Sequence, residues 1–373
     1  MNRPRPPSPA QARPSCRRGG RAARVGAAVL AAWLLGLAPP APAAAPVAGS
    51  AQAVHARQLA DGLPDALRVL SASRAGAAHA IYMLWYAGDP HSRALFDWYR
   101  QHVADLDSIG VAVYWIPLPT SDADTLDADC LDSIAAFARC NAPDYQADAG
   151  DALDRLVANF NAWSAFAAAH GLRGVWAAWP SPRGWTGSAN VLASHDGGVD
   201  GAATFGLYLR KLGLRDLHPL LASLHTIAQP GVDGAQRLYV FWDPDCAYCR
   251  RDFLTIAANA AAIHAANPTL GIRWVPLGVL RPGSRAKAAR ALAGYAAMAR
   301  DERGYDEADE SGALSAAPGV DPALAREESE NRLAWAALTG GGGTPSYLWT
   351  GHGAMRLTPG SPDDVMQFLA ALR

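Results

Sequence analysis

Two cysteines with two residues between them, Cys246 and Cys249, are the residues of this 373-residue chain whose type and spacing could do redox chemistry. They precede a segment with apolar residues at helical spacing, so we expect Cys246 at the start of a helix. A sulfur there faces unpaired backbone N–H groups and the positive end of the helix dipole, which favour the thiolate. Such thiols have a pKa of about 3.5 to 7.5 instead of about 8.5. We predict that Cys246 attacks disulfides and that Cys249 resolves the mixed disulfide.

The alternatives for this pair are a structural disulfide and half of a zinc site. A zinc site needs two further ligands, and the ten histidines have no metal-ligand spacing. Cys130 and Cys140 lie ten positions apart, outside any redox motif. We predict that these two form a stabilising disulfide worth about 2–3 kcal/mol, with a regulatory thiol pair as the alternative. No metal and no cofactor is predicted.

An internal duplication organises the rest of the chain. Five signals recur in the same order and indicate two copies of one α/β unit. Residues 81–85 match 238–242 at a separation of 157, and residues 115–118 match 274–277 at a separation of 159. Asn159, Ala162 and Trp163 resemble Asn331, Ala334 and Trp335 in the same way. At the two cysteine positions the first copy has Asp89 and Ser92, so only the second copy has a dithiol.

The elements expected in each copy are a buried strand, a helix and a second strand parallel to the first. The second copy then continues with a helical region at 284–335, strands at 346–349 and 355–357, and a helix at 362–372. We place the two copies at 44–215 and 237–373. The segment 216–236, which contains Pro219, Pro230 and Gly231, is predicted to be the connection between them.

Asp243 and Tyr248 are candidate modulators of Cys246. An acid near the thiolate, Asp243 or Asp245, would raise the pKa of Cys246 and oppose the helix dipole. Surface solvation and helix capping are the alternative roles of these two acids. Arg250 would favour the thiolate, but Arg93 stands at the same place in the copy without cysteines, which favours a structural role.

The segment Phe241-Trp242-Asp243-Pro244-Asp245-Cys246-Ala247-Tyr248-Cys249 resembles the active-site turn of the periplasmic disulfide isomerases of the DsbC and DsbG type. Gly343-Thr344-Pro345 resembles that family's second signature, a loop with a cis proline. The resemblance covers about residues 236–373. It implies a thioredoxin-like fold, with a central mixed β-sheet flanked by helices. By the duplication, residues 44–215 would be a degenerate thioredoxin-like domain that lacks the CxxC.

The same resemblance implies roles for the second signature. Pro345 would pack against the two cysteines, and Thr344 would present backbone groups to a bound peptide. The family's small N-terminal dimerisation domain is not recognisable, and the degenerate copy stands in its place. The oligomeric state is therefore left open.

The N-terminus has the features of a secretory signal. Residues 1–24 hold seven arginines and no acid, residues 25–37 are apolar, and a small-residue stretch follows. We predict a signal peptide at 1–43, with cleavage after Ala43, and a periplasmic protein. The predicted mature chain has 26 basic and 34 acidic residues, which argues against nucleic acid as a partner.

We therefore expect a periplasmic thiol:disulfide oxidoreductase, an isomerase or an oxidase. Its partners would be proteins with cysteines or disulfides and a membrane redox partner. The alternatives are a protein-disulfide reductase, and a chaperone-like or secretion-assembly binding module in which the dithiol is secondary.

Overall fold

The computed structural model describes residues 50–372, apart from 75, 121–125, 173–174, 194–199, 214–217, 310 and 352–353. The predicted signal peptide and the predicted domain end at residue 215 lie outside the described residues. The described residues form one compact unit. Within the described ranges, no helix combines the length and the apolarity that crossing a membrane requires.

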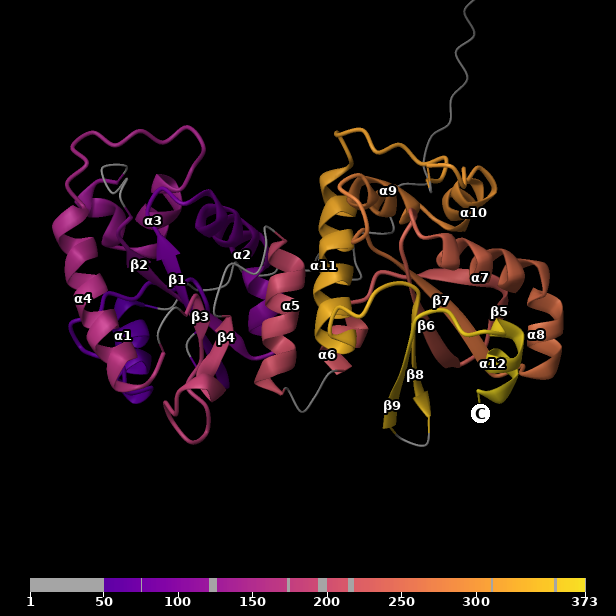
Figure 1. The fold of residues 1–373 in the computed structure, drawn as a ribbon, viewed down its shortest axis with the longest axis horizontal. Helices are drawn as coiled ribbons and strands as arrows, with labels where there is room; N and C mark the ends of the chain where they lie inside the picture. Colours follow the sequence, from indigo (N-terminus) through magenta and orange to yellow (C-terminus); the bar gives the residue numbers. More distant parts are fainter. Residues whose placement is uncertain are drawn as a thin grey trace, which may run out of the picture. The chain divides into compact units, whose positions relative to one another are not determined.

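The first copy is built on a four-stranded mixed sheet in the order β2-β1-β3-β4 (Figure 1). β1 (His79–Tyr86) is parallel to β2 (Val111–Leu118) and antiparallel to the short β3 (Ala177–Ala178), which pairs with β4 (Val191–Ala193). Both β1 and β2 are buried on their two faces, which explains why they are continuous apolar runs without alternation.

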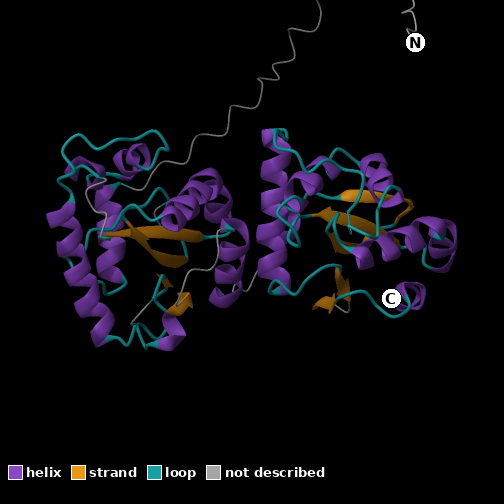
Figure 2. Cartoon of the chain, turned by 45° about the horizontal axis from the view of Figure 1, so that its top comes forward, coloured by secondary structure: helices purple, strands orange, loops and turns teal. Residues whose placement is uncertain are grey.

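Alternate residues of β1 enter two cores, one on each face of the sheet. Ile81, Met83 and Trp85 pack with α2 (Pro90–Ser108), α3 (Ile134–Cys140) and α5 (Gly201–Leu212). Tyr82 and Leu84 pack with α1 (Ala51–Ala60) and α4 (Leu153–Ala169). Figure 2 shows helices on both faces of each sheet.

The second copy repeats this plan with one more strand, in the order β5-β7-β6-β8-β9. Parallel β6 (Gln236–Trp242) and β7 (Leu270–Pro276) form the centre, and β8 (Ser346–Gly351) and β9 (Ala354–Pro359) follow as antiparallel strands. One face is covered by α7 (Ala247–Ala258), α8 (Ala260–Ala266), α10 (Tyr295–Arg303) and α12 (Val365–Ala371). α11 (Pro322–Thr339) covers the other face, and α9 (Ser284–Ala291) follows β7.

The duplication is visible in the elements themselves. β1 and β6 begin 157 positions apart, as α2 and α7 do, and β2 and β7 begin 159 apart. One buried asparagine in each copy makes the same contacts. Asn331 Nδ2 donates to the carbonyls of Pro276 and His225, both at 2.9 Å. Asn159 Nδ2 donates to the carbonyl oxygens of Pro117, at 2.9 Å, and of Arg68, at 3.0 Å. The predicted fold class, two tandem α/β domains with central mixed sheets flanked by helices, is confirmed.

The predicted connection 216–236 is wrong in part. It contains α6 (His218–Ala222) and strand β5 (Ile227–Asp233), which pairs with β7 at the edge of the second sheet. Pro230 and Gly231 suggested a turn, but an edge strand tolerates proline because its outer side needs no N–H donor. The register shifts between Ala228 and Asp233, where these two residues lie. The first copy keeps only a trace of this strand, the isolated bridge between Leu70 and Trp115.

Helices α5 and α11 join the two copies. Leu333 and Ala337 of α11 are buried in the first copy's core. Gly206 lets the helices approach closely, because a Cβ at this position would lie 2.5 Å from the Leu333 carbonyl oxygen. Asp200, the N-cap of α5, forms an ion pair with the buried Arg332, which also binds Glu328 at 2.8 Å.

Candidate active site

Cys246 is the N-cap of helix α7, and the short turn 243–245 connects it to the end of strand β6. Its sulfur accepts a hydrogen bond from the backbone N–H of Cys249 at 3.2 Å. Cys249 is fully buried one turn into the helix, and Cys246 is nearly so. Both are free thiols in this structure. The motif therefore lies at the start of a helix, as predicted.

The two thiols differ in their acidity. The pKa of Cys246 is lowered, above all by a hydrogen bond from the Cys249 thiol and further by the Cys249 N–H, although burial opposes these effects. Burial raises the pKa of Cys249 well above its ordinary value. This arrangement favours ionisation of Cys246 before Cys249. The geometry thus supports the predicted order of nucleophile and resolving cysteine.

The second signature reaches the dithiol. The Thr344–Pro345 peptide bond is cis, and the Cys246 thiol donates a hydrogen bond to the carbonyl oxygen of Thr344 at 3.4 Å. Pro345 is buried at the start of β8, next to the strand that leads to Cys246. The structure therefore brings together Cys246, Cys249 and the Thr344–Pro345 loop, which lies almost one hundred residues further along the chain.

Two buried aspartates, Asp243 and Asp245, lie in the turn between β6 and Cys246. Asp243 accepts hydrogen bonds from the N–H groups of Asp245 (2.8 Å), Val279 (2.7 Å) and Leu280 (3.0 Å). Burial raises its pKa in spite of these bonds. The Asp243 charge acts to raise the pKa of Cys246, which is the direction expected of a modulator. Neither aspartate is a surface residue, so the solvation alternative is wrong for both.

Sequence reasoning missed a third buried acid at this site. Glu302 of α10 accepts a hydrogen bond from the indole N–H of Trp242, the last residue of β6. Its other carboxylate oxygen is buried and has no hydrogen-bond partner among the described residues. Burial raises the pKa of Glu302 to about 8. Sixty positions separate Glu302 from Trp242, and no spacing in the sequence connects them.

Tyr248 and Arg250 lie on the outer side of the motif. Tyr248 is 62 % exposed, with the Arg251 guanidinium 5.4 Å from its ring centre, so it faces solvent and not the thiols. A ring in this position is available to touch a bound polypeptide. Arg250 donates to the backbone carbonyl of Glu302 at 3.3 Å and lies over the Tyr305 ring. These contacts hold α10 against α7, in agreement with a structural role.

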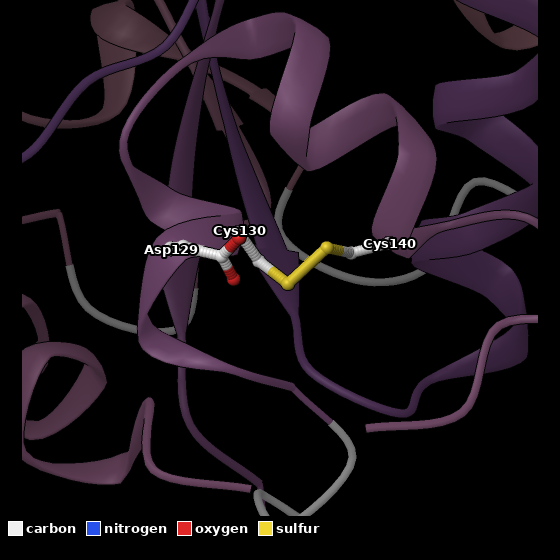
Figure 3. A group of neighbouring side chains, drawn as sticks. All are labelled: Asp129, Cys130 and Cys140. Atoms are coloured by element: carbon white, nitrogen blue, oxygen red, sulfur yellow. A yellow bond between two sulfur atoms is a disulfide. The ribbon is translucent and has the colours of Figure 1, made fainter. Parts of the chain in front are cut away.

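Cys130 and Cys140 form a disulfide, which agrees with the prediction. Figure 3 shows the bond with the carboxylate of Asp129 beside it. These three side chains are close enough to suggest a metal site. However, the two bonded sulfurs offer no thiolate, and the Asp129 carboxylate pairs with Arg139 at 2.9 Å. The group is therefore a disulfide next to a surface ion pair.

Comparisons with known proteins gave weak likenesses. No family model and no curated protein matches the chain. Among solved structures, the catalytic domain of Proteus mirabilis ScsC matches with 15% identity and a TM-score of 0.30. The match covers 41% of this chain and 94% of the ScsC domain. A thioredoxin-like oxidoreductase from Silicibacter pomeroyi matches with 22% identity and a TM-score of 0.26. This match covers 40% of this chain and 93% of the Silicibacter chain.

Proposed function

We propose that this protein is a thiol:disulfide oxidoreductase that isomerises or forms disulfides in exported proteins. The observation that carries the proposal is the Cys246 sulfur itself. It caps α7, accepts the Cys249 N–H at 3.2 Å and touches the carbonyl before a cis proline. A nucleophilic sulfur and a buried resolving thiol next to it are the parts that thiol–disulfide exchange needs.

The reaction proceeds in two balanced exchanges. The Cys246 thiolate attacks a sulfur of the client disulfide, so a mixed disulfide forms and one client thiolate leaves. If a client thiol then attacks the mixed disulfide, Cys246 is released and the client is isomerised without net electron transfer. If Cys249 attacks instead, the client leaves as a dithiol and Cys246–Cys249 becomes the disulfide. The reverse of this second path oxidises a client dithiol.

We place the reaction in the periplasm. The arginine-rich, then apolar N-terminal segment and the Cys130–Cys140 disulfide both support this localisation, because structural disulfides persist in oxidising compartments. In that setting a membrane protein would restore the redox state of the dithiol after each oxidation or reduction of a client.

The experiment that tests the function is a redox titration of the mature protein against glutathione, with Cys246 and Cys249 alkylated and counted by mass spectrometry. A midpoint between about −120 and −200 mV supports an oxidase or isomerase. A midpoint near about −270 mV changes the assignment to a reductase. A pair that stays oxidised below about −300 mV is a structural disulfide and refutes the proposal.

A trapping experiment tests the order of the two cysteines. The variant Cys249→Ser should accumulate a mixed disulfide with a scrambled client protein, because the resolving thiol is missing. The matched control Cys246→Ser should trap none. Equal trapping by both variants would contradict the assignment of Cys246 as the nucleophile.

A second candidate function, a binding module for apolar polypeptide segments, is favoured by one face of α4. Leu153, Val157 and Phe160 lie on the same side of this helix and are 42%, 40% and 46% exposed. The equivalent face of α11 is covered by the first copy: Ser329 there accepts the Trp98 indole N–H at 2.8 Å. The α4 face is thus exposed in the first copy, whereas the equivalent α11 face of the second copy is covered.

The binding function has its own test. The double variant Val157→Ser, Phe160→Ser should weaken binding of a reduced, unfolded client and leave the glutathione titration unchanged. Cys246→Ala should keep the binding. If Cys246→Ala abolishes the binding as well, capture depends on the dithiol and the separate binding function is wrong.

A further inference from the structure

A buried ion pair lies directly before the nucleophile. Lys287 Nζ of α9 lies 2.5 Å from Oδ1 of Asp245, and their side chains are 8% and 2% exposed. The Ser284 hydroxyl, one turn earlier in α9, donates to the other carboxylate oxygen at 2.8 Å. Asp245 is the residue before Cys246, so a single peptide bond joins it to the residue with the attacking sulfur. Helix α9 therefore places a buried cation beside the redox motif.

The first copy forms the same strand–turn–helix without this ion pair. At the position of Asp245 the first copy has Gly88, and at that of Asp243 it has Tyr86. The strand–turn–helix of the first copy forms all the same, with Asp89 as the N-cap of α2. A buried ion pair contributes little net stability, because desolvation of the charges offsets their attraction. Its occurrence only beside the dithiol points to the chemistry of the dithiol.

The charges around Cys246 are otherwise mostly acidic or distant. The Asp243 charge disfavours the Cys246 thiolate, and Glu302 of α10 adds a charge that interacts with Cys246 only when it ionises, near its raised pKa of about 8. Asp301, the neighbour of Glu302, interacts with Lys287 and with both aspartates. Arg250 pairs with the exposed Glu307, lies over the Tyr305 ring and also acts on the charge of Glu302. Among the described residues the buried cations are Lys287 and Arg332, and Arg332 pairs with Glu328 and Asp200.

We propose that Lys287 is a positioning residue for the reaction: it holds Asp245 and neutralises its charge, and so keeps the Cys246 thiolate populated at neutral pH. An uncompensated carboxylate in this buried place would repel the thiolate through a medium of low dielectric constant. The inference rests on the proposed function, because it concerns the reactivity of the same sulfur.

The experiment compares Lys287→Met, Asp245→Asn and the double variant. The thiolate of Cys246 is titrated by its absorbance at 240 nm and by its rate of alkylation at pH 6. Lys287→Met should raise the apparent pKa of Cys246 and slow alkylation about three- to tenfold, since one pKa unit is a factor of ten in thiolate below the pKa. Asp245→Asn should shift both quantities in the opposite direction. The double variant should return close to the wild type.

The opposite signs separate an electrostatic role from simple disruption. A loosened site would change both single variants in the same direction, and that result, or no shift in either, overturns the inference. Arg290→Met is the matched control, because Arg290 is on the same helix and binds the carbonyls of Ser315 and Ala317 at the surface. It should leave the titration unchanged. If Lys287→Met does not fold, Lys287→Arg and Asp245→Asn decide: the first must keep the wild-type titration, and the second must lower the pKa.

Alkylation needs no client and no redox partner, so the two proposals fail separately. A dithiol that does not titrate with glutathione refutes the proposed function, whatever the Lys287 variants do. If the dithiol titrates with glutathione but the Lys287 variants leave the apparent pKa and alkylation rate of Cys246 unchanged, only the role of Lys287 is refuted.

Discussion

Asp89 and Cys246 hold the same position in the two copies, and each caps the helix that follows it. The Asp89 carboxylate accepts the N–H of Ser92 at 2.6 Å, and the Cys246 sulfur accepts that of Cys249 at 3.2 Å. A carboxylate is an established helix cap, whereas a thiolate in this place is also a nucleophile. The two copies thus share one backbone geometry, which serves stability in the first and, under the proposed function, chemistry in the second.

Asp89→Ala should lower the free energy of unfolding by about 1 kcal/mol, because the cap of α2 is lost. Urea unfolding measures this change. Asp89→Asn keeps an acceptor oxygen and should cost much less. The midpoint of the glutathione titration should be the same in both variants, and a shifted midpoint would mean that the degenerate site acts on the dithiol.

Glu302→Gln should flatten the dependence of stability on pH. Burial raises the pKa of Glu302 from 4.5 to about 8, so between these values the carboxyl ionises in the unfolded chain but stays protonated in the folded protein. Wild-type stability therefore decreases as pH rises through this window, by up to about 1.4 kcal/mol per pH unit for this group. Urea unfolding at pH 5, 6, 7 and 8 should show a variant that gains on the wild type as pH rises. The exposed Glu307, changed to Gln, is the control and should keep the wild-type slope.

Arg332→Met should destabilise the protein by about 3–5 kcal/mol, because Glu328 and Asp200 lose their buried cation. Glu328 also accepts the N–H of Gly278 at 2.9 Å, so the loop after β7 should loosen as well. Arg139→Met, which breaks an exposed pair with Asp129, should cost less than about 1 kcal/mol. Similar costs for the two variants in chemical unfolding would contradict the assignment of Arg332 as the central ion of the α5–α11 contact.

Replacing both Cys130 and Cys140 by Ala should lower the free energy of unfolding by about 2–3 kcal/mol, since the disulfide closes a short loop. The titration of Cys246 and Cys249 should be unchanged, because this disulfide belongs to the other copy. A changed midpoint would support the regulatory thiol pair instead.

The duplication was predictable because its signals are local. Strands buried on both faces are continuous apolar runs, and the motif Asn-x-x-Ala-Trp marks a helix whose asparagine binds two backbone segments in each copy. Strand β5 was not predictable in the same way. Its exposed positions and Pro230 are typical of a connection, and only the pairing with β7 makes this segment a strand.

The cysteines and the cis-proline loop were also within reach of sequence reasoning, because each is a short motif. Lys287 and Glu302 were not. They arrive at the site from α9 and α10, 42 and 60 positions from the residues that they contact, and their own neighbours in the sequence have no special pattern. The tertiary fold alone puts these charges beside the sulfur.

The first copy's helix start without a thiol has a consequence for electron flow. With Cys130 and Cys140 bonded to each other, the described part of the chain stores a single pair of electrons, at Cys246 and Cys249. Two active dithiols in tandem could pass electrons from one domain to the other. This chain has no such relay, so one molecule can hold one client covalently at a time. Under the proposed function, the dithiol must therefore be restored after each net oxidation or reduction of a client, before the next one.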